Sequence, residues 1–282
     1  GSNSRMTLLE LSTDLSGRYV SFRINPLSFK EVVELTNTKE NDYENLLYDI
    51  FKWGSLPQRF LFNKDEDKIS YLSSVYDSII LKDIVERLGI KDIASFNKVL
   101  QYVLDTETRE FSRDNVIDYL KKEYHEIEDD NFYNYLEDFS KTFIMNKFYR
   151  YYIHGKNILK TLNKYYATDL GIKQIKTNND KINYSTALEN LVYNDLIIKD
   201  YKVFVGKTKK GEIDFIASKA NKIKYIQVCY DLSEESTRIR EFGAFDEFES
   251  EEKYVITLTK EDYSTADAKQ INVLDFLMND EF

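Results

Sequence analysis

Three polar residues near the C-terminal end of the sequence have the types and the order of a metal-dependent phosphodiesterase site. Glu189 falls in a stretch with helical periodicity, Asp214 in the apolar run Ile213–Ala217, and Gln227 in the run Ile223–Val228. Carboxylate oxygens are preferred ligands of Mg²⁺, and a bound divalent cation can activate water against a phosphodiester. The two acids are therefore predicted metal ligands and, together with Gln227, the predicted catalytic positions of a site that acts on nucleic acid.

One essential part of such a site is missing from the sequence. A strand that reads Glu-x-Lys would supply a further ligand and a cation beside the phosphate, but Gln227–Cys229 reads Gln-Val-Cys. Side chains alternate along a strand, so positions 227 and 229 share a face. Because an amide is a poorer Mg²⁺ ligand and a thiol carries no positive charge, we expect a degenerate site with weak metal binding at most. Lys224, Arg238 or Arg240 could replace the missing cation from a neighbouring element.

The elements that must position these residues follow one another as helix, three strands, helix, strand. Periodic apolar residues predict helices over 185–199 and 234–248, and short β-branched runs predict the strands. This order, αβββαβ, and the spacing of the three polar residues resemble the restriction-endonuclease-like, PD-(D/E)xK-type domain. The predicted strands are Tyr201–Val205, Ile213–Ala217, Ile223–Val228 and Tyr254–Leu258, with a hairpin loop at Lys207–Gly211 and a closing run at Ile271–Leu277.

The middle of the chain has the periodicity of helices followed by one alternating segment. Helices are predicted over Ile69–Leu88, Ile93–Leu104 and Phe132–Phe143, with a further helix capped by Ser112. Alternation in Phe148–Ile153 predicts a wing strand. Helices plus a hairpin make a winged-helix arrangement, so the predicted fold class is α+β in several domains: a helical winged-helix middle region, then a restriction-endonuclease-like domain.

Two groups of basic residues could bind nucleic acid, because such binding depends on lysine and arginine replacing counterions. The helix before the wing is rich in acids, which favours a structural or protein-contact role for that helix. The predicted nucleic-acid contacts are Lys147 and Arg150 of the wing and Lys207, Lys209 and Lys210 of the hairpin loop, and the wing also carries Lys156, Lys160 and Lys164.

Composition limits the classes of protein that the chain can represent. The 282 residues have 42% hydrophobic content and a net charge of −10, which argues against a strongly basic duplex-binding surface. A single cysteine excludes a disulfide framework and a cysteine-based zinc site. His125 and His154 are far apart and are read as surface or packing residues. Without a long apolar run or signal-peptide pattern, no membrane partner is expected and the predicted location is cytoplasmic.

Five features in the same order resemble the C-terminal region of a large prokaryotic family of AAA-type (AAA+ superfamily) ATPases. In that family an N-terminal P-loop domain precedes a helical, winged-helix middle and a nuclease-like C-terminal domain, and Gln in place of Glu without the following Lys is usual. The resemblance covers nearly the whole chain. It rests on Leu15–Arg18 with Pro26–Glu31, Trp53–Pro57, Ile80–Ile84, Lys164–Gly171, and Glu212–Phe215 with Gln227–Cys229.

The resemblance implies a nucleotide site that this chain cannot form alone, because the phosphate-binding Gly-x4-Gly-Lys-Ser/Thr loop is absent. No cofactor is therefore expected here, and ATP and Mg²⁺ are expected in a full-length parent whose P-loop domain is the missing partner. Asn3 matches the family's sensor position, although Gly1–Ser4 can also be a cloning remnant. Arg18 matches a sensor or arginine finger that reaches a γ-phosphate, with an ordinary surface role as the alternative.

The expected division of the chain is an ATPase-core remnant over 1–35, a helical lid plus winged helix over 36–178, and a restriction-endonuclease-like domain over 179–282. Three functions stay open. The chain is expected to be a non-cleaving module that recognises nucleic acid or a partner, in a parent that self-associates as AAA-type proteins do. One alternative is a metal-dependent DNA nuclease with a migrated cation, and the other is a protein-interaction scaffold without nucleic-acid contact.

Overall fold

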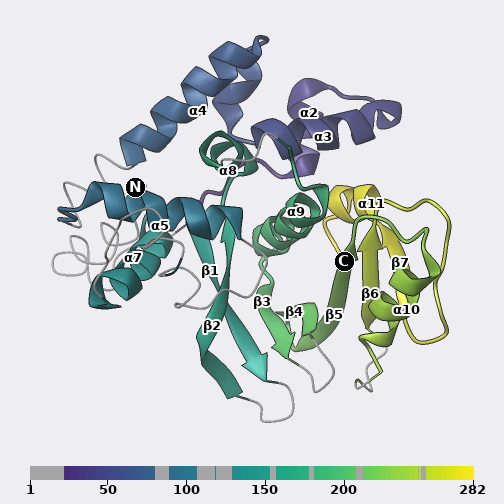
Figure 1. Ribbon diagram of the computed structural model, residues 1–282. Helices are drawn as coiled ribbons and strands as arrows, with labels where there is room; N and C mark the ends of the chain where they lie inside the picture. Colours follow the sequence, from purple (N-terminus) through teal and green to yellow (C-terminus); the bar gives the residue numbers. More distant parts are fainter. Residues whose placement is uncertain are drawn as a thin grey trace.

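The computed structural model describes residues 22–79, 89–106, 118, 129–152, 157–177, 181–207, 212–246, 248 and 252–282. Helices dominate its N-terminal part and one mixed β-sheet its C-terminal part (Figure 1). The predicted α+β class is confirmed at this level. Across the described ranges, every helix is too short or too polar to span a bilayer.

Several helices begin at residues whose side chains satisfy free backbone N–H groups. Ser28 forms a capping box with Glu31 at the start of α2, and Asp92 and Asp169 accept backbone N–H groups at the starts of α5 and α8. The helices are α2 (Phe29–Thr36), α3 (Tyr43–Trp53), α4 (Asp65–Ile79), α5 (Ile93–Asp105), α7 (Asp129–Lys141), α8 (Leu170–Lys176), α9 (Tyr184–Ile198), α10 (Glu235–Gly243) and α11 (Val273–Met278).

The strands form one seven-stranded sheet with the order β2-β1-β3-β4-β5-β6-β7. Strands β3, β4 and β5 form an antiparallel meander, and β6 and β7 continue it in parallel. Strand β1 pairs with β2 in antiparallel and with β3 in parallel orientation. The strands are β1 (Met145–Tyr152), β2 (Asn157–Ala167), β3 (Lys202–Lys207), β4 (Glu212–Lys219), β5 (Lys222–Cys229), β6 (Lys253–Thr257) and β7 (Lys269–Asn272).

Helices α9 and α10 cover opposite faces of this sheet. Leu188 of α9 lies in one cluster with Phe215 and Ile256 of the sheet. Val255 lies in a second cluster with Phe245, just after α10. Because neighbouring residues of a strand point to opposite faces, Val255 and Ile256 show that the clusters lie on the two sides of β6. The sheet is therefore buried from both sides where the predicted site lies.

Residues 184–257 contain helix, three antiparallel strands, helix and parallel strand in the predicted order. The helix expected to reach Phe248 ends at Gly243, and Ala244 to Asp246 continue as turns. Glycine lowers helix propensity by about 1 kcal/mol relative to alanine, which fits an end at this position. In the middle region α4 begins before Ile69, while residues 80–88 and the helix predicted from Ser112 lie outside the described residues.

Hydrogen bonds and the core cross two of the expected domain boundaries. The predicted wing strand belongs to β1, which pairs with β3 at Arg150 and Val205, so the hairpin β1–β2 extends the C-terminal sheet across the boundary at 178/179. The boundary at 35/36 falls inside α2, whose Phe29 and Val32 pack in the cluster that holds α9. The helical part and the sheet therefore share one core.

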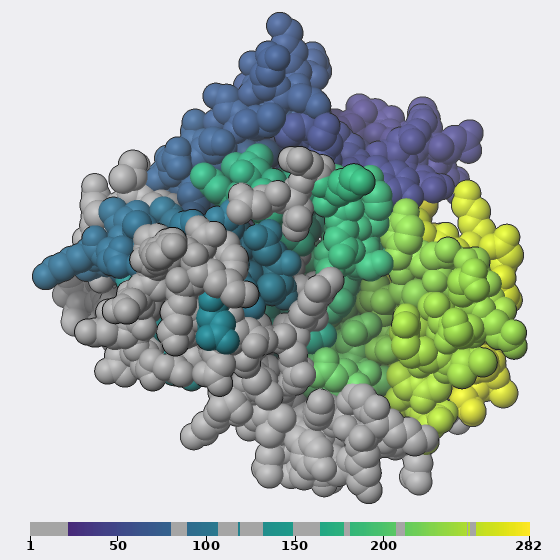
Figure 2. All heavy atoms as spheres, in the orientation of Figure 1, coloured from purple at the N-terminus to yellow at the C-terminus, as the bar shows by residue number. Residues whose placement is uncertain are grey.

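Helix α2 also meets the C-terminal end of the chain. Figure 2 shows the purple N-terminal residues beside the yellow C-terminal ones. Lys30 Nζ lies 2.5 Å from Asp280 Oδ2, and Phe276 of α11 packs edge-on against Phe282. Tyr201 OH donates a hydrogen bond to the Phe282 carbonyl. Helix α2 and the C-terminal segment are thus joined to each other, and Tyr201 joins that segment to the start of β3.

Candidate functional site

The predicted site lies where β4 and β5 stop pairing. Between Phe204 and Gly206 strand β3 advances by two residues while β4 advances by three, so β4 contains a bulge. The β4–β5 ladder ends at the pair Phe215–Ile226, one residue from Asp214. A bulge bends a strand and re-aims its side chains, and bulges are frequent beside active sites. The local backbone therefore opens at the position that the sequence singled out.

The side chains of Asp214 and Gln227 replace the missing ladder bonds. Gln227 Oε1 accepts a hydrogen bond from Asp214 N–H at 2.7 Å, and Asp214 Oδ2 accepts one from Val228 N–H at 2.9 Å. Gln227 Nε2 donates to Glu241 Oε2 of α10 at 3.0 Å. Arg240 Nη2 then lies 2.7 Å from the other Glu241 oxygen. Through these two hydrogen bonds the buried amide of Gln227 bridges β4 and α10.

Glu189 approaches this group from α9 and is held by residues of β2. Tyr166 OH donates to Glu189 Oε1 at 2.7 Å, and Lys164 Nζ lies 3.6 Å from the same oxygen. Lys164 Nζ is also 3.5 Å from Glu212 Oε2 of β4. Burial and the neighbouring Glu189 raise the pKa of the Tyr166 hydroxyl well above its usual value, so Tyr166 is a proton donor here.

The structure joins Asp214 to Gln227 by a hydrogen bond and places Glu189 near enough for its charge to act on Asp214. Burial raises the pKa of Asp214 well above its usual range, the negative charge of Glu189 raises it further, and the Lys164 ammonium opposes both effects. Cys229 lies on the α10 face, where burial first and Glu241 second raise its pKa to about 11. The thiol therefore stays protonated at neutral pH and supplies neither charge nor a metal ligand.

The arrangement does not fit a divalent metal ion. Within the described ranges, no set of three histidine, cysteine, aspartate or glutamate residues is placed to hold one. Mg²⁺ needs several oxygen ligands around one point. Here Gln227 Oε1 accepts from Asp214 N–H, Asp214 Oδ2 from Val228 N–H, and Glu189 Oε1 from Tyr166. One oxygen of each of these three side chains is therefore already engaged with a protein donor.

Of the three cations proposed to replace the missing lysine, only Arg240 lies at the site. Lys224 pairs with Glu252 at 3.0 Å and lies over the Phe282 ring, away from the site. Arg238 donates to the carbonyls of Leu232 and Ser233 in the loop before α10. Lys164, expected in a basic wing, instead lies between two carboxylates of the site.

Only some of the residues predicted to bind nucleic acid lie in the described part of the chain. Lys147 pairs with Glu137 of α7 at 3.3 Å, which reduces its value as a phosphate contact. Arg150 and Lys207 lie on neighbouring parallel strands, β1 and β3, and their side chains are not described. The other predicted positions fall outside the described residues, namely Lys209 and Lys210 of the hairpin loop and the nucleotide-sensing candidates Asn3 and Arg18.

Asp214→Asn should stabilise the protein more at pH 8 than at pH 5. The raised pKa means that the folded protein holds a proton that the unfolded chain releases above about pH 4, so wild-type stability falls as pH rises toward the folded value. Asparagine keeps an acceptor for Val228 N–H and removes this loss. We expect a gain on the order of 2 kcal/mol at pH 8, measured by urea unfolding. An equal effect at both pH values would contradict the raised pKa.

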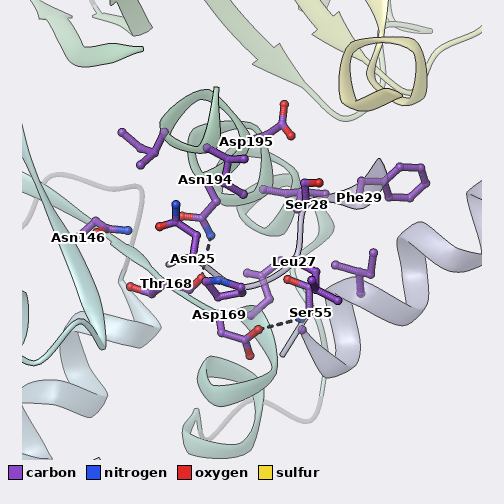
Figure 3. Close-up of a pocket in the computed structure, with 17 residues that line it drawn as sticks. Asn25, Leu27, Ser28, Phe29, Ser55, Asn146, Thr168, Asp169, Asn194 and Asp195 are labelled. Carbon is purple, nitrogen blue, oxygen red and sulfur yellow. Dashed lines mark hydrogen bonds between the residues drawn. The ribbon is translucent and has the colours of Figure 1, made fainter. Parts of the chain in front are cut away.

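A cavity lined by both polar and apolar residues lies apart from this site, among the segment before α2, the end of α3, β1, the start of α8 and the C-terminal half of α9 (Figure 3). Its polar groups largely bind one another. Asp169 accepts from Ser55 N–H at 2.8 Å, Asn194 Nδ2 donates to the carbonyl of Thr168 at 3.2 Å, and Asp195 pairs with Lys199. These bonds tie the helical part to α9 and the sheet, so we assign the cavity a structural role.

Two of the segments that carry the family resemblance interlock beside this cavity. Gly54 has a φ of +69°, and a Cβ there would lie 2.2 Å from the Asp169 carboxylate. A Cβ on Gly171 would lie 2.2 Å from the carbonyl oxygen of Trp53. Arg59 is buried and donates to the Gly54 carbonyl at 2.9 Å. The Trp-Gly-Ser-Leu-Pro and Thr-Asp-Leu-Gly segments thus fit closely together, with Gly171 against the backbone of Trp53 and Gly54 against the Asp169 carboxylate.

Sequence reasoning missed four residues of the site. Glu212 had a usable signal, because it lies two residues before Asp214, directly before the predicted strand Ile213–Ala217. Glu241 and Tyr166 had none, since each is one of many acids or tyrosines in its segment. Lys164 was assigned to the wing because its strand was not expected in the C-terminal sheet.

Comparison with known proteins gives relatives without an assigned activity. Residues 44–182 match the family model described as domain of unknown function DUF8612. An uncharacterized protein of Haemophilus influenzae is 34% identical over 236 residues, which are 83% of this chain and 59% of that protein. One of Methanocaldococcus jannaschii is 29% identical over 259 residues, which are 87% of this chain and 57% of that protein. The chain thus spans less than two thirds of either relative, and no solved structure matches it significantly.

Proposed function

We propose that the chain is a C-terminal part of an AAA-type ATPase and that its sheet carries a restriction-endonuclease-like domain used for recognition without cleavage. The ligand would be nucleic acid or a protein partner of the parent. The helical part before the sheet would be the winged-helix region of that parent. ATP and Mg²⁺ would act in the P-loop domain of the parent, and nothing in this chain would be needed to bind them.

The arrangement of elements supports the nuclease-like part of the proposal. Helix α9 precedes the antiparallel meander β3–β4–β5, and helix α10 leads to β6, which is parallel to β5. The backbone N–H of Asp214 in the second meander strand donates a hydrogen bond to Gln227 of the third, and the acid of α9, Glu189, is near enough for its charge to act on the pKa of Asp214. Fold alone does not imply activity, so the chemistry has to be argued from the site.

The observation that carries the absence of cleavage is the amide of Gln227. Its oxygen accepts from Asp214 N–H and its nitrogen donates to Glu241. To bind a metal ion, the Gln227 oxygen would have to turn away from Asp214 N–H and toward the cation. A glutamate at position 227 would have no N–H group to donate to Glu241, so two carboxylates would face each other. The residue that should complete the metal site instead fastens α10 to β4. Phosphodiester hydrolysis would lack both the metal and its electrostatic stabilisation.

The proposal of a parent ATPase rests on the family resemblance of the sequence and on the lengths of the two relatives. The matched regions are 59% and 57% of the two relatives, which leaves room in those proteins for a further domain. The Trp53–Pro57 and Lys164–Gly171 segments, on which the resemblance partly rests, form the interlock between helical part and sheet. A P-loop in the gene upstream of these segments would support the proposal, and its absence would contradict the ATPase part.

A second candidate function is a metal-dependent nuclease with a migrated cation, and the position of Lys164 favours it. The ammonium lies 3.6 Å from Glu189 and 3.5 Å from Glu212, where a cation could stand beside a phosphate. The lack of a metal-holding set among the described residues makes it the weaker candidate.

We expect no nicking of supercoiled plasmid and no cutting of single-stranded DNA with Mg²⁺ or Mn²⁺. DNA binding, measured by fluorescence anisotropy, should be weak and fall steeply between low and physiological salt, because the net charge of −10 opposes it. Asp214→Ala and Lys164→Met are the matched variants for the nicking assay. Metal-dependent nicking that both variants abolish would establish the nuclease instead. No binding at low salt would favour a scaffold that contacts protein only.

A further inference from the structure

Lys164 reaches the carboxylate site from outside the αβββαβ unit. It lies in β2, the outer strand of the hairpin that extends the sheet, and its partner in the ladder is Phe148 of β1. Its side chain is 5% exposed, although it ends in a charged ammonium. A buried lysine is costly unless its charge is matched. Here Glu189 and Glu212 supply that match from two other elements.

The Lys164 ammonium contacts carboxylates from two different elements. Nζ is 3.6 Å from Glu189 Oε1 and 3.5 Å from Glu212 Oε2, so it stands between carboxylates of α9 and β4. Asp214 is near enough for the Lys164 charge to act on its pKa. A metal ion entering here would meet a fixed positive charge a few ångströms away, and like charges at such distances repel strongly in a buried site.

We propose that Lys164 is a built-in counter-ion that occupies the cation position of the Glu189–Glu212–Asp214 cluster and keeps divalent metal out. The inference rests on the proposed function, since it takes this cluster as the nuclease-like site. It gives a reason why the site would not cleave phosphodiesters. The hairpin β1–β2 carries a lysine ammonium into the position that a divalent cation from solution would otherwise take. It also gives Glu189 and Glu212 a common cationic partner within the protein.

Lys164→Met tests the proposal, because methionine keeps the apolar stem and removes the charge. Titration calorimetry with MnCl₂ should show no binding to the wild-type chain up to millimolar concentration. The variant should bind Mn²⁺ at least about tenfold more tightly than the wild type, which corresponds to about 1.4 kcal/mol. Adding Glu189→Gln to Lys164→Met should abolish the gained binding, since it removes one of the two carboxylates beside the vacated position.

Lys224→Met is the matched control. Lys224 is also a buried lysine of the sheet and pairs with one carboxylate, Glu252, at 3.0 Å, so its loss should create no Mn²⁺ site. If near-UV circular dichroism shows that Lys164→Met is unfolded, Lys164→Gln provides the same test with a polar side chain. The counter-ion proposal would be overturned if the wild type bound Mn²⁺ as tightly as the Lys164 variants. It would also be overturned if a folded Lys164 variant bound no Mn²⁺. The titration contains no DNA, so plasmid nicking by the wild type would instead overturn the proposed function.

Discussion

Replacing Gly171 by alanine should lower the free energy of unfolding by about 3 kcal/mol or more, because the added methyl group meets fixed backbone. A Cβ at this position would lie 2.2 Å from the Trp53 carbonyl oxygen and 3.0 Å from the amide nitrogen of Gly54. Neither atom belongs to a side chain that can rotate away. The start of α8 would have to move from the end of α3, and the contacts between helical part and sheet would loosen.

Gly243→Ala is the matched control, since Gly243 is also helical and nothing lies within 4 Å of a Cβ there. It should leave stability unchanged or raise it by about 0.5–1 kcal/mol, the usual gain of alanine over glycine in a helix. Urea unfolding followed by circular dichroism measures both variants. Equal stability of Gly171→Ala and the wild type would show that α3 and α8 are not interlocked.

Gly54→Ala should be similarly harmful for a different reason. Its φ of +69° is strained for any residue with a side chain, and the Cβ would collide with the Asp169 carboxylate at 2.2 Å. That carboxylate also accepts N–H groups of Ser55 and Ile172. Displacing it would leave both donors buried without a partner, a cost of about 1–3 kcal/mol for each unsatisfied group.

Gln227→Glu should destabilise the protein by about 3 kcal/mol at pH 8, although it restores the residue type of an active nuclease. The new carboxylate could still accept from Asp214 N–H, but it would lose the donor to Glu241 and face that carboxylate at hydrogen-bond distance. The site would then hold two adjacent negative charges, with Arg240 paired to only one of them.

The penalty should shrink at pH 5 because one of the two carboxyls can then take a proton and donate it to the other. Repulsion and burial raise the folded pKa of the pair above the unfolded value, so stability is lost as pH rises through that range. Exchanging the two residues, as Gln227→Glu with Glu241→Gln, restores one donor and one acceptor and should recover most of the loss. Urea unfolding at both pH values checks this. Failure of the exchange to rescue would mean that the Gln227–Glu241 bond does not hold α10 to β4.

Much of the local structure was readable from the sequence because it depends on neighbours along the chain. Apolar periodicity placed α9 and the meander strands within a few residues of their observed ends, and Ser28, Asp92 and Asp169 mark helix starts by the chemistry of their side chains. The likeness of Glu189, Asp214 and Gln227 to a nuclease site also needed only residue type and order.

What only the tertiary structure decided are the contacts between distant segments. The parallel pairing of β1 with β3 joins residues more than fifty positions apart, and no local pattern specifies it. That pairing carries Lys164 and Tyr166 to Glu189, which turns an expected surface lysine into the internal cation of the site. In the same way the bulge in β4 and the position of α10 direct Gln227 toward Glu241. Side-chain type predicts which groups can bind a metal or a phosphate, but the packing of strands and helices determines which partner each group meets first.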